Sequence, residues 1–461
     1  MRSFRKTAVL VTAAPLLALL VSTASAETIA GAMAKAYANN PDLNAARAGL
    51  RATDEGVAIA KSGYRPQVSA SASRTTSWSS NSGSVFVADH NTISDSLGIT
   101  ITQSVFDGFQ TLNRVKAAEA GVFATREQLR AQEMQILFSA ASSYANIARD
   151  QDIVSIRKQN LKFLREQLNA AKSRQDVGEG TSTDVSLAQA QLAGAEALLA
   201  AAISQLKQSE SVYWQIVGEK PSGIRQPAPA KRGIPDRVDD AIAIGLKDHP
   251  SVLASLHAVD VAGYNVKTAQ GTMLPGVTLQ GSVSRNYNSY VDSLSGDSSA
   301  LTGRLTVPIY QGGAEYGQIR QAKEQLGQQK ILVDSARLSV QNSIISSYAQ
   351  MEAAKAALVA NRQQLSAANK ALDGVIEERN VGQATTLDVL NTQQNVLNAK
   401  EQIAESQRNL VVASYAVIAA TGHLTVSEQG LNVAEYDPTE HYNAVKDAWI
   451  GLRTVNDQNA E

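Results

Sequence analysis

The sequence predicts a mainly α-helical protein with a transmembrane β part, in which the whole pattern of elements occurs twice. A nine-residue phrase is repeated, as VGEGTSTDV from Val177 and VGQATTLDV from Val381, with five identical positions at an offset of 204 residues. Apolar residues on both sides of each phrase recur every seven residues, which is typical of coiled-coil helices. Earlier in each copy the apolar period is two, as in β-strands. We therefore expect duplicated long antiparallel coiled-coil helices and four β-strands per chain.

The composition supports long helices and argues against a nucleic-acid partner. Aromatic residues make up only 5% of the 461 residues, which suits helices with small-residue seams better than a thick globular core. The chain has 42 Lys and Arg against 43 Asp and Glu. This balance gives no sign of a surface that binds polyanions.

Residues 1–26 have the features of a signal peptide. A basic start precedes an apolar run from Ala8 to Val21, and Ala24-Ser25-Ala26 is an A-x-A cleavage site. A membrane-anchoring helix is the weaker alternative, because a bilayer span needs about 20 apolar residues. The absence of cysteine excludes disulfides, thiolate metal sites and a lipidated cysteine. We expect no transmembrane helix after the signal peptide, so that any membrane crossing must use strands.

The duplication covers nearly the whole chain. NNPDL at Asn39 corresponds to DHPSV at Asp248, at an offset of 209 residues, whereas the offset is 204 from the SVFDGF and PIYQGG segments onward. The predicted organisation is a first repeat at 27–218, a linker at 219–235, a second repeat at 236–422 and a tail at 423–461.

The seven-residue period predicts four long helices. Its members are Ile147, Val154, Leu161 and Leu168; Met351, Leu358, Leu365 and Leu372; Leu192, Leu199, Leu206 and Tyr213; and Val396, Ile403, Leu410 and Val417. Such a period produces a left-handed coiled coil. The helix from about Leu112 to Arg174 would be ~95 Å long at 1.5 Å per residue, so it must be a rod that packs beside other rods. Each repeat is expected to begin with one shorter helix.

The strands are predicted where apolar and polar residues alternate. The apolar positions are Ile93, Leu97, Ile99, Ile101 and Val105 in Asn91–Asp107, and Val277, Leu279, Val283, Leu301, Leu305, Val307 and Ile309 in the second repeat, with a fainter series at Val68, Ala70 and Ala72. A half-buried soluble strand has the same pattern, but the signal peptide favours a transmembrane barrel. Ser79–Ser84 and Asn288–Ser299 are expected as outer loops. Four strands cannot close a barrel and open edges are not tolerated in lipid, so an oligomer is required.

This order of elements resembles the TolC family of outer-membrane efflux channels. The residues that carry the match are the NPDL and HPSV phrases, Pro66 and Pro275 before the first strands, VFDGF and IYQGG after the hairpins, and both VG-x(5)-DV phrases. The resemblance implies a homotrimer with a shared 12-stranded barrel in the outer-membrane lipid and a helical tunnel in the periplasm. It also implies docking onto a periplasmic adaptor and an inner-membrane proton-driven or ABC transporter, for drug efflux or type I protein secretion. The tail resembles that of alphaproteobacterial members.

The repeated phrases are the candidate functional site. Gly178 and Gly382 suit the left-handed backbone of a helix reversal. Thr181 or Thr183, and Thr385 or Thr386, are candidate helix caps, and Asp184 and Asp388 follow them.

Two interpretations of the aspartates stand side by side. They complement a helix dipole, or they form a carboxylate ring around the pore of a trimer, with some pKa values raised by mutual repulsion. The resemblance places pore-narrowing aspartates at Asp388 and a bonding aspartate at Asp184. The family's second pore aspartate is replaced by Asn391, and its tyrosine and arginine latch by Arg379 and Ala384. Arg379 is expected either to pair with Asp184 or to be an ordinary surface arginine.

The resemblance assigns adaptor docking to the turns at Val177, Gly178, Val381 and Gly382, for which a purely structural role is the alternative. No nucleophile elbow, P-loop or Rossmann phrase is present, so an enzyme is not expected, and neither is a cofactor. No metal-ligand spacing is found among the histidines, which are His90, His249, His257, His423 and His441. The competing function is a periplasmic coiled-coil adaptor without a pore.

Overall fold

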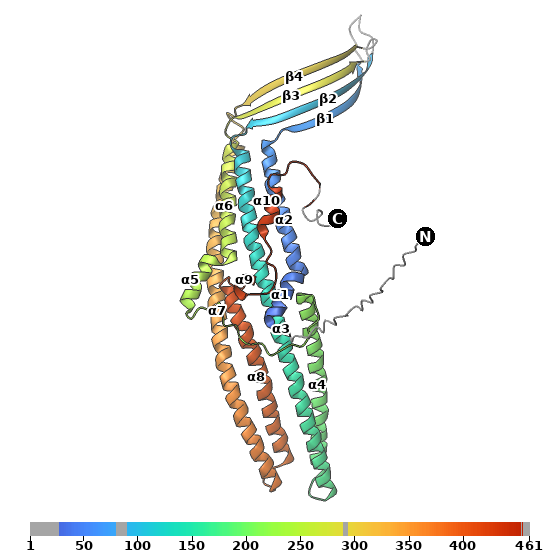
Figure 1. The fold of residues 1–461 in the computed structure, drawn as a ribbon, viewed down its shortest axis with the longest axis vertical. Coiled ribbons are helices and arrows are strands. Elements are labelled where there is room, and N and C mark those ends of the chain that lie inside the picture. Colours follow the sequence, from blue (N-terminus) through green and yellow to red (C-terminus); the bar gives the residue numbers. More distant parts are fainter. Residues whose placement is uncertain (1–26, 80–89, 289–293, 453, 455–461) are drawn as a thin grey trace, which may run out of the picture.

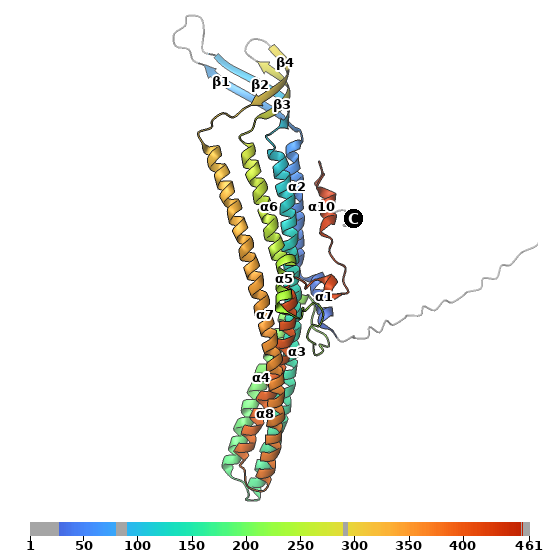
Figure 2. The ribbon, with the colours of Figure 1, turned by 90° about the vertical axis from the view of Figure 1, so that its left-hand side faces the viewer.

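The computed structural model describes residues 27–79, 90–288, 294–452 and 454, and within them the chain is a long rod with a sheet at one end (Figure 1). The opposite end carries two helical turns (Figures 1 and 2). In chain order the elements are α1 (Ile29–Asn39), α2 (Pro41–Lys61), η1 (Ser62–Tyr64), β1 (Gln67–Ser79), β2 (His90–Phe106), α3 (Gln110–Asp176), α4 (Ser182–Val217), α5 (Val238–Asp248), α6 (Pro250–Gly271), β3 (Gly276–Asn288), β4 (Leu294–Thr306), α7 (Ala314–Asn380), α8 (Thr386–Ala420), α9 (Val426–Gln429) and α10 (Pro438–Val445). The predicted fold class, long helices with four strands per chain, is confirmed.

The expectation of one shorter helix per repeat is wrong, because each repeat begins with two. The break falls at Asn40 in the first repeat and at His249 in the second, where ψ is 124° and 126°. Each of these residues precedes a proline, and the proline ring excludes the helical conformation from the residue before it. Each side chain then caps the next helix by accepting a backbone N–H, from Leu43 and from Ser251 respectively.

The four strands form one antiparallel sheet in the order β1-β2-β3-β4, with β1 and β4 at its edges. The predicted loop at Asn288–Ser299 is wrong at Asn288, the last residue of β3, and from Leu294 onward, because β4 begins there and pairs with β3. Val307 and Ile309 lie beyond the last residue of β4, Thr306. Most of the other predicted loop, 80–84, lies outside the described residues.

Helices α3 and α7 each contain 67 residues and are therefore ~100 Å long. The seven-residue series of α3 is buried, with Ile147 inaccessible and Val154, Leu161 and Leu168 less than one-tenth exposed. Helix α4 packs along α3 and helix α8 along α7, forming two helical hairpins that lie side by side in both views (Figures 1 and 2). The coiled-coil prediction is confirmed.

The largest hydrophobic core lies midway along the rod, where α1, α2 and the upper ends of α4 and α8 surround α3. Tyr37, Tyr144 and Tyr213 are its largest buried side chains. The Tyr144 hydroxyl donates to the carbonyl of Glu27 at 2.6 Å and accepts the N–H of Arg225 at 3.0 Å, so it fixes both the N-terminal segment and the linker.

The expectation that no helix after the signal peptide has membrane-spanning character needs a correction at α4. By length and composition alone, α4 is long and apolar enough to cross a membrane, with a mean hydropathy of 1.2 over its most apolar 18-residue window. Its hydropathy comes from many alanines, and Ala188, Ala195 and Ala202 are buried. Helix α4 packs against α3 beside the other hairpin, so its apolar stripe is a coiled-coil seam.

Candidate functional site at the two helical turns

The repeated phrases form two turns of the same geometry at the end of the rod away from the sheet (Figure 1). In the first, the N–H of Glu179 donates to the carbonyl of Arg174 at 2.9 Å and the N–H of Gly178 donates to that of Gln175 at 3.0 Å. The second turn repeats both bonds around Gly382. These bonds define a Schellman motif, which needs a left-handed residue, and φ is +82° at Gly178 and +79° at Gly382. The predicted left-handed backbone at both glycines is confirmed, and their part in adaptor docking stays a prediction.

Each turn ends in a capping box that begins the next helix. The Thr181 hydroxyl accepts the N–H of Asp184 at 3.1 Å, and the Asp184 carboxylate accepts the N–H and hydroxyl of Thr181 at 3.2 and 2.6 Å. Thr385 and Asp388 make the same three bonds at 3.2, 2.9 and 2.6 Å. Of the candidate caps, Thr181 and Thr385 are therefore the ones used. The reciprocal bonds satisfy N–H groups that have no partner within the helix.

Within one chain the capping boxes hold both aspartates ionised. The Thr181 hydroxyl, its N–H and the Thr386 hydroxyl, which bind the Asp184 carboxylate, lower its pKa, and the nearby charge of Arg174 has the same effect. The Thr385 hydroxyl and N–H lower the pKa of Asp388. The expected rise of pKa by mutual repulsion would need carboxylates from several chains. The contacts within a single chain act in the opposite direction.

Arg379 does not pair with Asp184. Its Nη1 donates to Oε1 of Gln167 on α3 at 2.6 Å, so the side chain joins the second hairpin to the first. Burial, and then the nearby charge of Arg174, lower the pKa of Arg379. Asp184 and Arg379 line the same cavity of about 440 Å³ between the two turns. Of the two expectations for Arg379, the ion pair is replaced by a cross-hairpin hydrogen bond, and the side chain is partly buried rather than an ordinary surface arginine.

Sequence reasoning missed a series of polar links between α3 and the second hairpin, which we call the hairpin ladder. From the turns upward its contacts are Arg379 with Gln167 at 2.6 Å, Gln393 with Asn160 at 2.8 Å, Arg157 with Glu401 at 2.7 Å, Arg149 with Glu405 at 3.3 Å and Arg408 with Asn146 at 2.7 Å. Gln393 and Asn160 are buried. A sequence signal existed, because Gln393 interrupts the buried positions Leu390, Val396 and Leu397.

The remaining predicted residues are on the surface of the turns. Val177 and Val381 are the C-cap residues directly after α3 and α7, and each is 71% exposed despite its apolar side chain. Asp388 is exposed, and so is Asn391, which lies one helical turn further along α8. The structure therefore places Asp184 and Arg379 on one cavity and leaves Asp388, Asn391 and both valines facing outward.

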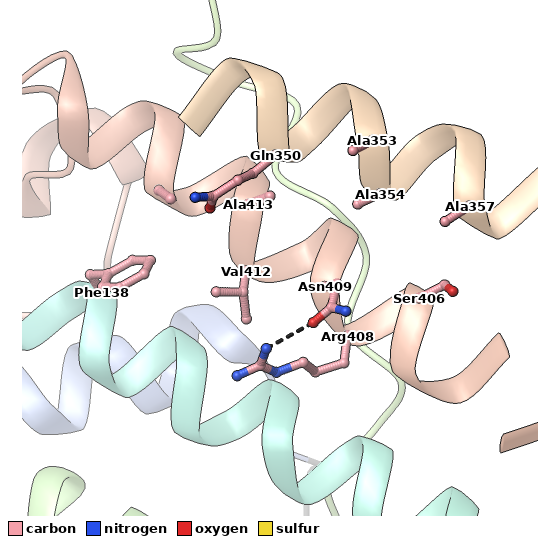
Figure 3. A pocket seen from close by; sticks show the side chains of 11 residues that line it. Phe138, Gln350, Ala353, Ala354, Ala357, Ser406, Arg408, Asn409, Val412 and Ala413 are labelled. Atoms are coloured by element: carbon pink, nitrogen blue, oxygen red, sulfur yellow. Dashed lines mark hydrogen bonds between the residues drawn. The ribbon is translucent and has the colours of Figure 1, made fainter. Parts of the chain in front are cut away.

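A second cavity, of about 400 Å³, opens between α7 and α8 near the middle of the rod (Figure 3). The small side chains of Ala353, Ala357 and Ala413 leave space unfilled between the two helices there, and Phe138 of α3 lies at one end of the cavity. Arg408 extends below it and donates to Asn409 at 2.8 Å. Among the described residues no group of three or more acidic or histidine side chains could hold a metal ion.

The sequence profile of the outer membrane efflux protein family matches residues 32–218 and 242–423. The chain is 46% identical over 449 residues to the outer membrane efflux protein BepC of Brucella suis, covering 96% of this chain and 97% of that protein. It is 26% identical over 432 residues to the outer membrane protein TolC of Escherichia coli, covering 89% of this chain and 85% of that one.

Its fold matches that of solved outer-membrane channels. The Campylobacter jejuni CmeC channel superposes with a TM-score of 0.77 at 16% identity, covering 91% of this chain and 89% of that one. These matches exclude the pore-less adaptor, and they agree with the sheet at one end of the rod and the paired hairpins at the other. The chain therefore belongs to the outer membrane efflux protein family, and it is a TolC-like channel of the Gram-negative outer membrane that extends into the periplasm.

Proposed function

We propose that the chain is the exit duct of a tripartite export system and works as a homotrimer. The observation that carries this proposal is the sheet with two open edges at the end of two ~100 Å helices. Open edges are not tolerated in lipid, and three such sheets supply the 12 strands of a closed barrel. The helices then form a tunnel that extends far into the periplasm, where an adaptor and an inner-membrane transporter meet its mouth.

The proposed cargo is small toxic compounds. A relative at 46% identity is named an efflux protein, whereas a relative at 24% identity, AprF of Pseudomonas aeruginosa, is named an alkaline protease secretion protein. Deletion of the gene should lower the minimal inhibitory concentrations of several antibiotics, and expression of the intact chain should restore them. Unchanged susceptibility together with loss of a secreted protein would assign the duct to type I secretion.

The proposed gate is the end of the rod that carries the two turns. A trimer brings six turns together around one axis, and a ring of carboxylates in a constriction attracts cations. Asp388 is the pore-facing candidate, because the contacts of its carboxylate in the described part of the chain lie within its own capping box. Asp184 instead shares its contacts with Thr386 of the second hairpin. Opening would separate the hairpins and break the lowest contacts of the hairpin ladder.

Planar-bilayer conductance of the purified mature protein tests this gate. Asp388→Asn removes the charge but keeps a side-chain oxygen that can accept the N–H of Thr385, because an amide at this position of a capping box can make the same bond as a carboxylate. We expect small cation-selective pores whose selectivity falls in Asp388→Asn, whereas Asp373→Asn, a matched loss of charge higher on α7, should leave selectivity unchanged. Equal selectivity in the unmodified protein and both variants would show that Asp388 acts only in the capping box, and it would not contradict the proposed duct.

The proposed adaptor contact uses Val177 and Val381, whose exposed side chains project from the outermost turns. Val177→Ser and Val381→Ser should weaken capture of the adaptor by the purified trimer, because apolar area buried on binding supplies most of the driving force. Serine substitution of Val359, which is 57% exposed and lies some 20 residues before the second turn on α7, is the control. Undiminished capture by both turn variants would assign docking to another surface.

A further inference from the structure

The last described residues of the tail expose a cluster of large apolar side chains. Trp449 is 68% exposed, and Ile450 and Leu452 are almost completely so. They follow α10, which lies against α2 near the sheet end of the rod (Figure 2). We call Trp449, Ile450 and Leu452 the tail cluster. Exposed apolar residues that gather in one place indicate an interaction surface.

The tail cluster is held in place by polar contacts with the end of α2. Asp447 accepts from Nζ of Lys61 at 2.6 Å, and the carbonyl of Ala448 accepts from Nη1 of Arg65 at 2.6 Å. The Arg65 guanidinium also lies 4.7 Å from the centre of the Trp449 ring. These contacts fix the segment beside the last residues before β1, rather than leaving it to extend into solution.

Earlier in the tail, α10 is also fixed to α2 by a polar contact. Nδ1 of His441 lies 3.0 Å from Oδ2 of Asp54, and both side chains are almost fully buried. The tail is therefore tied to α2 at two levels, and the tail cluster is at the level nearer the sheet.

The strand register shows where the membrane lies relative to the tail cluster. On the apolar face of the sheet, two ion pairs lie towards the outer end, Arg74 with Asp95 at 2.7 Å and Arg285 with Asp297 at 3.2 Å. Below the first of them the paired residues of this face are apolar. These pairs are Ala72 with Leu97, Ala70 with Ile99 and Val68 with Ile101. We take the ion pairs as the outer limit of the lipid-facing band.

The inner limit of the band then falls at the tail cluster. A band of about 25 Å, crossed by strands that are tilted by about 40°, corresponds to about ten residues. Counting ten residues from Arg74 towards the rod reaches Tyr64, next to Arg65, and counting ten from Asp297 reaches Val307. Tyr64 and Val307 are 51% and 53% exposed, and Tyr310 is 75% exposed. Aromatic residues gather at membrane–water boundaries, and Trp449 lies beside Arg65 at this level.

We propose that the tail cluster inserts into the periplasmic leaflet of the outer membrane and anchors the tail to glycerophospholipid. Trp449 lies at the polar boundary, and Ile450 and Leu452 extend into the acyl region beside the barrel wall. Arg65, which holds the segment, lies at headgroup depth, where a guanidinium meets lipid phosphate. The anchor braces the junction of barrel and rod from outside without a lipidated cysteine, a residue that the chain lacks.

The three tryptophans of the chain provide a direct test, because they lie at three different levels. Trp78 is in β1, and Trp214 is in α4, far from the sheet (Figure 1). Three variants each keep one tryptophan and have the other two replaced by phenylalanine. Each variant is placed in nanodiscs of phosphatidylcholine, with or without bromine near the headgroup end of the acyl chains. The protein with only Trp449 keeps the tail unchanged, so the measurement does not depend on a disruptive substitution.

We expect brominated lipid to reduce the fluorescence of Trp449 at least about twofold, as expected for an interfacial tryptophan, and to leave Trp214 unchanged. Trp78 lies beyond the Arg74–Asp95 pair and serves as a reference outside the lipid-facing band, whereas a Leu97→Trp variant, inside the band, shows that the quencher reaches the barrel. Quenching of Trp449 by dissolved acrylamide but not by brominated lipid would place the tail cluster in water and overturn the proposal. Resistance to both quenchers would place it against a neighbouring protomer and overturn it equally.

Discussion

The N-cap of α6 should make the rod sensitive to mild acid through one histidine. His249 begins α6, and its Nδ1 accepts the N–H of Ser251 at 3.1 Å, so the ring must be neutral to cap the helix. Burial, and then the charge of Arg130, lower the pKa of His249 from 6.5 to about 4. The first repeat has Asn40 at the same place, also as a cap. The substitution His249→Asn therefore copies a cap that the chain already uses and that does not titrate.

The sign and size of the effect follow from the lowered pKa. The folded chain resists protonation more than the unfolded chain does, so its stability is complete above pH 6.5 and is lost as the pH falls towards 4. Between pH 7 and pH 5 this loss is about 2 kcal/mol, with each pKa unit counting about 1.4 kcal/mol. The cost falls on the start of α6, where the N–H of Leu253 donates to the carbonyl of His249.

Hydrogen exchange measures this loss at the helix start. After correction for the intrinsic pH dependence, the protection of the Leu253 amide should fall about 30-fold from pH 7 to pH 5, since 1.4 kcal/mol is a factor of ten. In His249→Asn it should change little. Imidazole NMR, with His249 identified by its absence from that variant, should show no titration near pH 6.5. A His249 signal that titrates at its ordinary pKa, or equal protection at the two pH values, would refute the reasoning.

Three further predictions, which use five substitutions, test the turns and the core. Gly382→Ala should cost about 1–2 kcal/mol of stability through its left-handed backbone alone, because the space around this residue is open. Gly422→Ala should cost more, because its added carbon would lie 2.9 Å from a backbone atom. Thermal unfolding of both variants measures the order of the two losses, and equal losses would contradict it. Thr385→Ala should cost about 1 kcal/mol by removing a cap and Thr385→Ser much less, which exchange protection at the start of α8 reports. Tyr144→Phe should cost about 1–3 kcal/mol by leaving the buried carbonyl of Glu27 and the partly buried N–H of Arg225 without their partner, and an unchanged midpoint of urea unfolding would show that water replaces the hydroxyl.

Elements set by local periodicity could be predicted from the sequence. The apolar residues of α3 and α7 recur every seven positions over many turns, and α3 begins and ends within two residues of the predicted Leu112 and Arg174. The Schellman turns and capping boxes were also predictable, because each uses bonds between residues at most five positions apart. The break before Pro41 and Pro250 had the same kind of local signal and was missed.

Features set by distant contacts were beyond such reasoning. The start of β4 is polar and contains Gly296, and it is a strand because β3 pairs with it through contacts such as Ser284 with Ser298 at 2.8 Å. The partner of Arg379 lies 212 positions away on α3, and nothing local distinguishes Gln167 from Asp184. The docking of the tail on α2, at a separation of 387 positions for His441 and Asp54, has the same origin.

The two turns share one repeated sequence, but their aspartates have different surroundings and are expected to have different roles. Local chemistry is the same in both copies, since glycine, threonine and aspartate build the same Schellman turn and capping box. The surroundings differ, because Asp184 meets Thr386 and the charge of Arg174, whereas Asp388 is left at the surface. Neutralising Asp184 should therefore loosen the contact between hairpins, and neutralising Asp388 should alter only the charge at the mouth. If the two variants changed conductance in the same way, the shared cap rather than the different surroundings would determine the role of both aspartates.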